Sequence, residues 1–144
     1  MLVQNVMNTR ILHIEPQVTL LDAAEKMLAH RIDTLLVMKD DELLGMIGLR
    51  DLFTAPIPAY YGNSMLHHED EAQLSNIWKT TLVRNLMNEK VLTVNEDVTL
   101  LRALELMVNT GKHPLLVLRD RKVVGIISRM DIVRAMLEQA KDAE

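Results

Sequence analysis

The sequence predicts an α/β fold in which one unit, ordered strand, helix, strand, strand, helix, occurs twice and packs small mixed sheets against helices. The main observation is an internal duplication: when Val83–Ile132 is laid over Val3–Leu52, about 19 of 50 positions are identical without a gap. The second is that each copy alternates a segment of helical period with short continuous apolar runs. We expect the copies to be related by a pseudo-twofold axis and to leave clefts between them, where ligands commonly bind.

The first half of each copy predicts a short strand and a helix. The strands are expected at 11–14 and 91–94, and the helices follow Thr19 and Thr99, whose hydroxyls suit an N-cap. In the second copy the helix is expected to end at Gly111, because glycine readily adopts the left-handed conformation that closes a helix.

The second half of each copy predicts a hairpin and a closing helix. Continuous apolar runs at 35–38 and 115–118 favour strands that are buried on both faces. Each run is followed by a charged turn and a second apolar strand, at 43–47 and 123–127, and a final helix opens just beyond. A helical crossover makes the first two strands of a copy parallel, and the short turn makes the last two antiparallel.

The domain boundaries follow from the duplication. We expect the first repeat over 1–55, the second over 83–144, and a partly helical linker over 56–82. Three of the four aromatic residues of the chain lie in this linker, namely Tyr60, Tyr61 and Trp78. Their rings suit either covering a core or subunit interface, or stacking on an adenine.

Composition excludes several classes of function. The chain has no cysteine, which rules out thiol catalysis, disulfides and cysteine-based zinc sites. A net charge of −4 gives no basic surface for nucleic acid. No apolar run approaches the roughly 18 residues of a membrane span, and the first residues lack a signal-peptide pattern. We therefore expect a cytoplasmic protein without nucleic-acid or membrane partners, and, because no nucleophile–base motif is present, no enzymatic activity.

The segment Gly125–Asp131 carries the clearest chemical signal. A strand ends there, and a helix starts with the hydroxyl of Ser128 and, three residues later, the carboxylate of Asp131. The unpaired amides and the dipole at a helix N-terminus favour a phosphate near Ser128, and a carboxylate can accept both hydroxyls of a ribose. The same Ser-x-x-Asp spacing also fits a capping box, so a purely structural interpretation stays open.

The corresponding segment of the first copy differs at one position. Asp51 is present, but Gly48 stands where the second copy has a serine, so only a backbone amide remains for an anion. A helix that lacks the cap hydroxyl and still carries the aspartate fits pure capping less well. This favours a role of the two carboxylates beyond the cap.

Taken together, the chain resembles a tandem pair of cystathionine-β-synthase (CBS) domains, a Bateman module, of the stand-alone type. The resemblance covers nearly everything outside the linker. It rests on the duplication, on the Val-Thr-Leu-x-x-Ala-x-x-x-Met helix starts, on the segments 30–37 and 112–117 that lead into buried strands, and on the two Gly-x-x-x-x-x-Asp endings. Similar modules bind adenine nucleotides or adenosyl compounds in the clefts between the copies. The resemblance therefore implies a regulatory ligand-binding module.

The resemblance also implies one competent ligand site and one weaker site. The competent site would hold phosphate at Ser128 and ribose at Asp131, and His113 lies where related modules place a basic phosphate contact. Arg129 is either a solvated helix charge or a further phosphate contact. The base would be flanked by residues of the first copy: Leu12, His13, Ile32, Asp33 and Thr34. The weaker, mirror-related site would use Asp51, Gly48, Leu92, Thr93 and Lys112.

The ligands implied by the resemblance are AMP, ADP, ATP or S-adenosylmethionine, with no catalytic cofactor and no metal. The implied partners are a second copy of the chain, which forms a homodimer over exposed apolar helical faces, and an effector protein in trans. Two other interpretations remain. One is a ligand-free structural dimerisation module, in which Ser128 and Asp131 are only caps. The other is a metal-responsive regulator that uses His67–Glu71, although adjacent side chains point apart and a solvated linker explains this cluster more simply.

Overall fold

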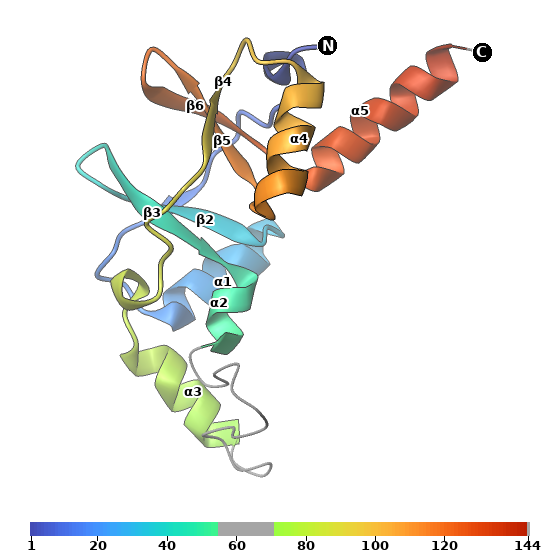
Figure 1. Cartoon of the computed structure of the whole chain (residues 1–144). Helices are drawn as coiled ribbons and strands as arrows, with labels where there is room; N and C mark the ends of the chain where they lie inside the picture. The colour runs from blue at the N-terminus through green and yellow to red at the C-terminus, as the bar shows by residue number, and fades with distance from the viewer. Residues whose placement is uncertain (55–70, 144) are drawn as a thin grey trace. The chain divides into compact units, whose positions relative to one another are not determined.

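A computed structural model describes residues 1–54 and 71–143 and confirms the predicted α/β architecture. The described elements are η1 (Val3–Asn5), β1 (His13–Ile14), α1 (Leu20–His30), β2 (Thr34–Lys39), β3 (Glu42–Gly48), α2 (Leu49–Thr54), α3 (Glu71–Thr80), η2 (Val83–Asn85), β4 (Thr93–Asn95), α4 (Leu100–Thr110), β5 (Leu115–Arg119), β6 (Lys122–Ile127) and α5 (Arg129–Asp142). The order strand, helix, strand, strand, helix therefore occurs twice along the chain (Figure 1). The repeat boundaries at 1–55 and 83–144 stay predictions, and Tyr60, Tyr61 and His67–Asp70 lie outside the described residues.

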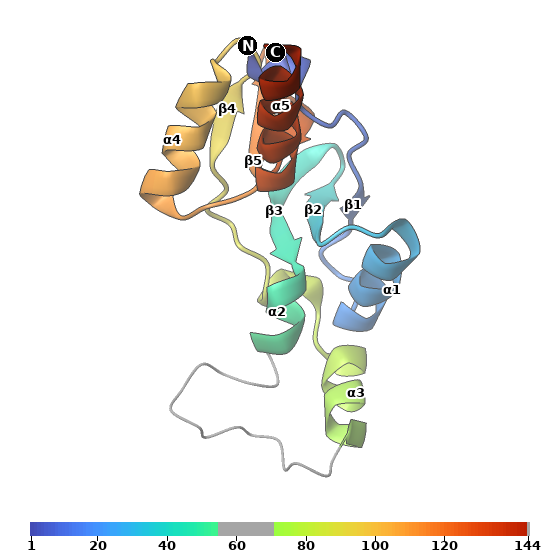
Figure 2. The ribbon, with the colours of Figure 1, turned by 90° about the vertical axis from the view of Figure 1, so that its right-hand side faces the viewer.

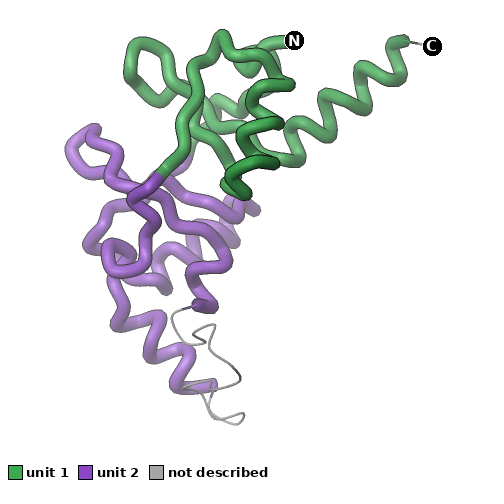
Figure 3. Tube along the Cα trace, viewed as in Figure 1, with its two compact units in different colours: residues 1–11, 91–144 green, residues 12–90 purple. Residues whose placement is uncertain are grey.

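The chain divides into two compact units (Figure 3). Unit 1 combines residues 1–11 with residues 91–144, and unit 2 is the continuous stretch 12–90. The first eleven residues therefore belong to the unit that contains the second sequence copy.

Each unit contains one three-stranded mixed sheet, in the order β1-β2-β3 in unit 2 and β4-β5-β6 in unit 1. As the sequence predicts, the first two strands of each sheet are parallel and the last two are antiparallel. In unit 1, α4 and α5 lie on the same side of the sheet (Figures 1 and 2). The middle strands β2 and β5 supply the fully buried apolar residues Leu35–Val37 and Leu115–Val117, in agreement with their continuous apolar sequence.

A short segment ahead of the first strand of a repeat completes the core of each unit. In unit 1, Val3 is fully buried and its backbone N–H donates to the carbonyl of Val98 at 2.8 Å. In unit 2, Val83 is fully buried and donates in the same way to Val18 at 2.8 Å. Unit 2 therefore draws its completing segment from beyond the linker, whereas unit 1 draws its segment from the start of the chain.

Gly45 and Gly125 lie where these segments approach the sheet. Met46, next to Gly45, exchanges both backbone hydrogen bonds with Asn88, at 2.9 and 2.8 Å. A β-carbon on Gly45 would lie 2.6 Å from the carbonyl oxygen of Asn88, whereas one on Gly125 would lie 2.5 Å from the sulfur of Met7. In each hairpin the register shifts next to the residue that pairs with the glycine. The shift lies between Val37 and Met38 in β2 and between Val117 and Leu118 in β5. Glycine is therefore needed at position 45, where the Asn88 backbone approaches closely, whereas the nearest atom at position 125 belongs to a side chain.

The helix ends follow the sequence signals. Thr19 caps α1 and forms a capping box with Asp22, and Thr99 caps α4 by accepting from the backbone N–H of Arg102. Gly111 closes α4 in the left-handed conformation with φ of 69°, as predicted. At the end of α1 a non-glycine residue, Arg31, adopts the same conformation with φ of 54°.

Helix α3 lies within the range predicted as the linker and belongs to unit 2. The indole N–H of Trp78 donates to the carbonyl of Leu52 at 2.7 Å, and its ring contacts Phe53 with centroids 6.2 Å apart. Trp78 also packs on the apolar core of unit 2. Of the two sequence-based interpretations for the linker aromatics, Trp78 therefore matches the covering of a core.

Candidate functional site

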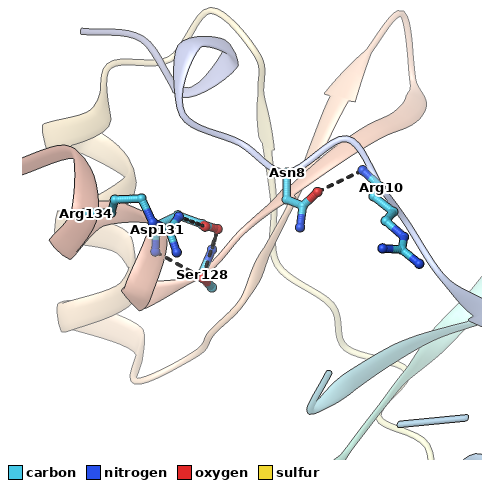
Figure 4. Close-up of polar contacts among 5 residues, drawn as sticks. All are labelled: Asn8, Arg10, Ser128, Asp131 and Arg134. Carbon is cyan, nitrogen blue, oxygen red and sulfur yellow. Dashed lines mark hydrogen bonds and ion pairs between the residues drawn. The ribbon is translucent and has the colours of Figure 1, made fainter. Parts of the chain in front are cut away.

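The start of α5 brings Ser128 and Asp131 together, as the sequence predicts. Strand β6 ends at Ile127, and Ser128 is the N-cap, with φ of −103° and ψ of 168°. Asp131 Oδ2 accepts from the backbone N–H of Ser128 at 2.8 Å and from its hydroxyl at 2.9 Å, while Ser128 Oγ accepts from the backbone N–H of Asp131 at 3.2 Å (Figure 4). The capping box is therefore present, and one carboxylate oxygen is used to hold it.

The other carboxylate oxygen is paired with an arginine. Arg134 Nη1 donates to Asp131 Oδ1 at 3.1 Å, and Figure 4 shows the two side chains meeting on α5. The side chain of Asp131 is 13% exposed and that of Arg134 is 62% exposed. Arg134 is absent from the sequence-based set of site residues. Its signal was available, because an aspartate and an arginine three residues apart on a helix form ion pairs.

A groove of about 470 Å³ lies between the N-terminal segment and α5 in unit 1. Its volume is within the usual range of about 300–1,000 Å³ for small-molecule sites. The lining residues are Met1, Asn5, Val6, Asp131, Arg134, Ala135, Glu138, Gln139 and Asp142. Three carboxylates against one guanidinium make this lining unfavourable for a phosphate. The features that favour an anion are instead the amides at the start of the helix, beside Ser128.

Another turn of unit 1, Asn8–Arg10, lies on the segment that pairs with β6. Asn8 exchanges backbone hydrogen bonds with Ile126 at 2.8 and 3.0 Å, and its side-chain carbonyl accepts from the backbone N–H of Arg10 at 2.9 Å (Figure 4). Asn88 and Lys90 repeat this turn in unit 2, also at 2.9 Å. The repeated Met-Asn pair is the sequence signal for it, and it was not used to predict site residues.

In unit 2 the structure brings together four predicted site residues at one end of the sheet. Thr34 pairs with Gly48 across the hairpin, and the backbone N–H of Gly48 donates to Asp51 Oδ2 at 2.7 Å. The carbonyl of Asp33 accepts from the backbone N–H of Leu49 at 2.8 Å. Asp51 thus holds the start of its helix through the Gly48 amide without a serine, so the missing hydroxyl does not by itself argue against a capping role for this aspartate.

The other predicted residues of unit 2 flank β1 and the start of β2. The carbonyl of Leu12 accepts from Leu36 at 3.1 Å, and the exposed His13 pairs with Leu36 in register. The carbonyl of His13 also accepts from the ammonium of Lys26 at 2.6 Å. Ile32 is partly buried against the unit 2 core.

The remaining predicted residues belong to unit 1. Leu92 is partly buried, and its carbonyl accepts from Leu116 at 3.1 Å. Four others are exposed: Thr93, Lys112, His113 and Arg129. Each predicted site combines residues of unit 1 with residues of unit 2, and this combination stays a prediction.

Clustered metal ligands and membrane-spanning helices were sought among the described residues. Within 1–54 and 71–143, no three histidine, aspartate or glutamate side chains are arranged to hold a metal ion. His67–Asp70, on which the metal-responsive interpretation depends, lie outside these ranges. Among the helices that the structure describes, none is both long and apolar enough to cross a bilayer.

Comparison with known proteins identifies the family. The CBS domain model matches residues 3–57 and 83–138. An uncharacterized 17.7 kDa protein of Acidianus ambivalens is 28% identical over 138 residues, which cover 94% of this chain and 73% of that protein. The mitochondrial CBS domain-containing protein CBSX3 of Arabidopsis thaliana is 30% identical over 129 residues, and the chain spans only 55% of its length.

The solved structure of CBSX2 from Arabidopsis thaliana in complex with AMP is similar in fold. Its TM-score is 0.74 and its sequence identity 25%, over 96% of this chain and 98% of CBSX2. A crystal structure described as a CBS domain gives a TM-score of 0.77 at 26% identity. Because the family model matches both sequence copies and the fold agrees, the chain belongs to the CBS domain family and carries two CBS domains in tandem.

Proposed function

We propose that this tandem CBS pair is a regulatory module without catalytic activity that binds an adenine nucleotide or adenosyl ligand at the start of α5. The observation that carries the proposal is the pair Ser128–Asp131, a hydroxyl and a carboxylate held at a helix N-terminus. The complex of CBSX2 with AMP supports it, because that protein matches this chain over nearly its whole length. The candidate ligands are AMP, ADP, ATP and S-adenosylmethionine.

Each group of the proposed site has a chemical role. The amides at the start of α5 favour a phosphate, and Arg129 and His113 would be additional contacts. The Ser128 hydroxyl donates to Asp131 Oδ2 at 2.9 Å, so it would contact the phosphate by turning its proton away from the carboxylate. Asp131 Oδ1 would accept from the ribose hydroxyls, because Oδ2 already accepts two hydrogen bonds from Ser128. We assign the base to five residues of unit 2: Leu12, His13, Ile32, Asp33 and Thr34.

A second site would be weaker. It would use Asp51, Gly48, Leu92, Thr93 and Lys112. Because Gly48 has no hydroxyl, an anion at the start of α2 gains only backbone amides. One occupied site and one weak or empty site in each chain is the expected pattern.

The regulatory output is proposed to reach a partner protein in trans. A ligand shifts the equilibrium between two arrangements of the module only by the difference in its affinity for them. Contacts to residues of both units would supply such a difference, since a change in their arrangement alters the contacts that the ligand makes.

Replacing Asp131 tests this site. Asp131→Ala is expected to weaken AMP binding by about 10- to 100-fold, because hydrogen bonds to a charged group contribute about 1.5–3 kcal/mol. Asp51→Ala, the matched change in unit 2, is expected to change AMP affinity less than about threefold, which corresponds to much less free energy than one hydrogen bond to a charged group. Dissociation constants are measured by isothermal titration calorimetry with AMP, ADP, ATP and S-adenosylmethionine.

Two controls separate ligand binding from capping. Asp131→Ala is expected to lower the free energy of unfolding by about 0.5–2 kcal/mol through loss of the cap, and Asp131→Asn retains a cap acceptor without the charge. Wild-type protein with a ligand at about 100 times its dissociation constant gains about 2.7 kcal/mol of stability. If none of the four ligands stabilises the wild type, the chain is better explained as a ligand-free dimerisation module.

We also propose a homodimer, because unit 1 exposes an apolar helical face. On α5, Met130, Val133 and Leu137 are 66%, 56% and 55% exposed, and they recur at helical spacing. Leu101 and Val108 on α4 are 66% and 72% exposed. Clustered apolar residues of this kind commonly mark protein interfaces.

Sedimentation velocity at micromolar concentration is expected to show the mass of two chains. Val133→Asp combined with Leu137→Asp should shift the sedimenting species to one chain, because burying two carboxylates in an apolar interface is unfavourable. Lys141→Asp, an exposed charge change further along α5, should leave the dimer intact. A wild-type protein that sediments only as a single chain would rule the dimer out at these concentrations.

A further inference from the structure

We propose that Arg134 makes the start of α5 selective for adenosine ligands with a negatively charged 5′ group over neutral ones. The inference rests on the proposed function and narrows its ligand class to adenosine 5′-phosphates. It starts from the ion pair between Arg134 Nη1 and Asp131 Oδ1, at 3.1 Å.

The capping box and Arg134 together occupy both oxygens of the Asp131 carboxylate. Oδ2 accepts two hydrogen bonds from Ser128, at 2.8 and 2.9 Å, whereas among the described residues Oδ1 accepts from Arg134. A carboxylate oxygen has room for about two hydrogen bonds, so Oδ1 is the oxygen that a ribose diol would reach. The diol must therefore share Oδ1 with the guanidinium or displace it.

Displacement of Arg134 is inexpensive, and a phosphate makes it favourable. The Arg134 side chain is 62% exposed, and exposed ion pairs three residues apart on a helix contribute little to stability. The Asp131 carboxylate contacts both the Ser128 hydroxyl, at 2.9 Å, and Arg134, at 3.1 Å, so the guanidinium and the proposed phosphate position share this carboxylate as a neighbour. A guanidinium pairs with phosphate through two parallel hydrogen bonds. When the ribose diol displaces Arg134 from Asp131, the phosphate therefore gives the guanidinium a new negative partner. A neutral ligand offers no such replacement.

Unit 2 has no arginine at the equivalent position. Thr54 stands there, and its hydroxyl donates to the carbonyl of Asp51 at 3.1 Å. The proposed selectivity is therefore a property of the α5 start, and it reinforces the expected difference between the two sites.

The test compares AMP with 5′-methylthioadenosine, which share adenine and ribose and differ in charge at the 5′ position. Arg134→Gln retains hydrogen-bond donors without the charge, and Arg134→Lys retains the charge without the planar fork. Lys141→Gln removes a charge at the far end of α5 and serves as the control. Dissociation constants are measured for the full chain by calorimetry at low and moderate salt.

Arg134→Gln is expected to weaken AMP binding about tenfold and to leave 5′-methylthioadenosine within about twofold, because only the charge-assisted phosphate contact is lost. Arg134→Lys should recover most of the AMP affinity, and Lys141→Gln should change neither ligand.

Three results overturn the selectivity proposal while leaving the proposed function in place. These are an equal loss for both ligands, an unchanged AMP affinity in Arg134→Gln, and a wild-type protein that prefers 5′-methylthioadenosine. If the wild type binds neither ligand, the proposed function itself fails and the selectivity with it.

Discussion

A fragment of residues 12–90 is expected to unfold cooperatively in urea, whereas a fragment of residues 1–80, of nearly equal length, is not. Residues 12–90 form the whole of unit 2, but residues 1–80 end before the segment that completes its core. The fragment 1–80, which follows the boundary of the sequence repeat, therefore lacks part of the folding unit. The fragment 12–90 crosses that boundary and retains the whole unit.

The missing contacts are large relative to the stability of a domain of this size. Val83 is fully buried in unit 2, and its burial contributes about 1.5–3 kcal/mol. The segment also makes the hydrogen bonds Leu20 to Thr81, at 2.9 Å, and the reciprocal pair between Met46 and Asn88. A core in a domain below about 80 residues supplies only about 3–5 kcal/mol of net stability, so losing these contacts is enough to unfold the fragment.

Trp78 makes the experiment direct. It is the single tryptophan of the chain, it is present in both fragments, and it packs on the unit 2 core. Its fluorescence and far-UV circular dichroism are followed together in urea. Equal cooperative transitions in the two fragments would contradict the prediction, because they would mean that residues 1–11 replace the related segment 81–90.

Gly45→Ala is expected to destabilise unit 2 by about 3 kcal/mol, and Gly125→Ala to change the stability of unit 1 by only about 0–1 kcal/mol. The new methyl group at position 45 would lie 2.6 Å from a backbone carbonyl, that of Asn88, which is held by two hydrogen bonds to Met46. At position 125 the nearest atom, at 2.5 Å, is the sulfur of Met7, the end of a flexible side chain, and the backbone carbonyl of Asn8 lies at 3.2 Å, a contact that a shift of a few tenths of an ångström relieves. Met7 can move aside, but Asn88 cannot move without breaking its pairing.

The two substitutions control each other, because they are the same change at equivalent positions of the two repeats. Urea unfolding of Gly45→Ala is followed by Trp78 fluorescence, which reports on unit 2, and both variants are followed by circular dichroism. If the two variants lose equal amounts of unfolding free energy, the clash with the Asn88 backbone is relieved as readily as the clash with the Met7 side chain, and the prediction is wrong.

The duplication explains why so much of the fold was predictable from the sequence. Two aligned copies give each pattern twice, so the Thr19 and Thr99 caps and the apolar runs at 35–38 and 115–118 support one another. The end of helix α4 at Gly111 could be predicted from local chemistry alone. The assignment of residues 1–11 to unit 1 did not follow, because Val3 and Val83 belong to related segments, and either one fits either sheet by sequence.

The candidate site was predictable in part, and for a local reason. Ser128 and Asp131 lie within one helical turn, so their hydrogen bonds follow from spacing alone. The ion pair of Arg134 with Asp131 was missed, although the three-residue spacing that favours it is present in the sequence. The pairing of half-sites across the two units depends on tertiary arrangement, which residue spacing does not encode.

The start of α2 differs from the start of α5 in a side chain and not in its backbone. Gly48 does not have a positive φ, and a β-carbon there would meet only the carbonyl of Asp33 at 3.6 Å and Asp51 Oδ2 at 3.8 Å, both ordinary distances. A β-carbon therefore fits at this position without a clash. Gly48→Ser would give the start of α2 the cap hydroxyl that Ser128 supplies at the start of α5, while Thr54 would still stand where α5 has Arg134.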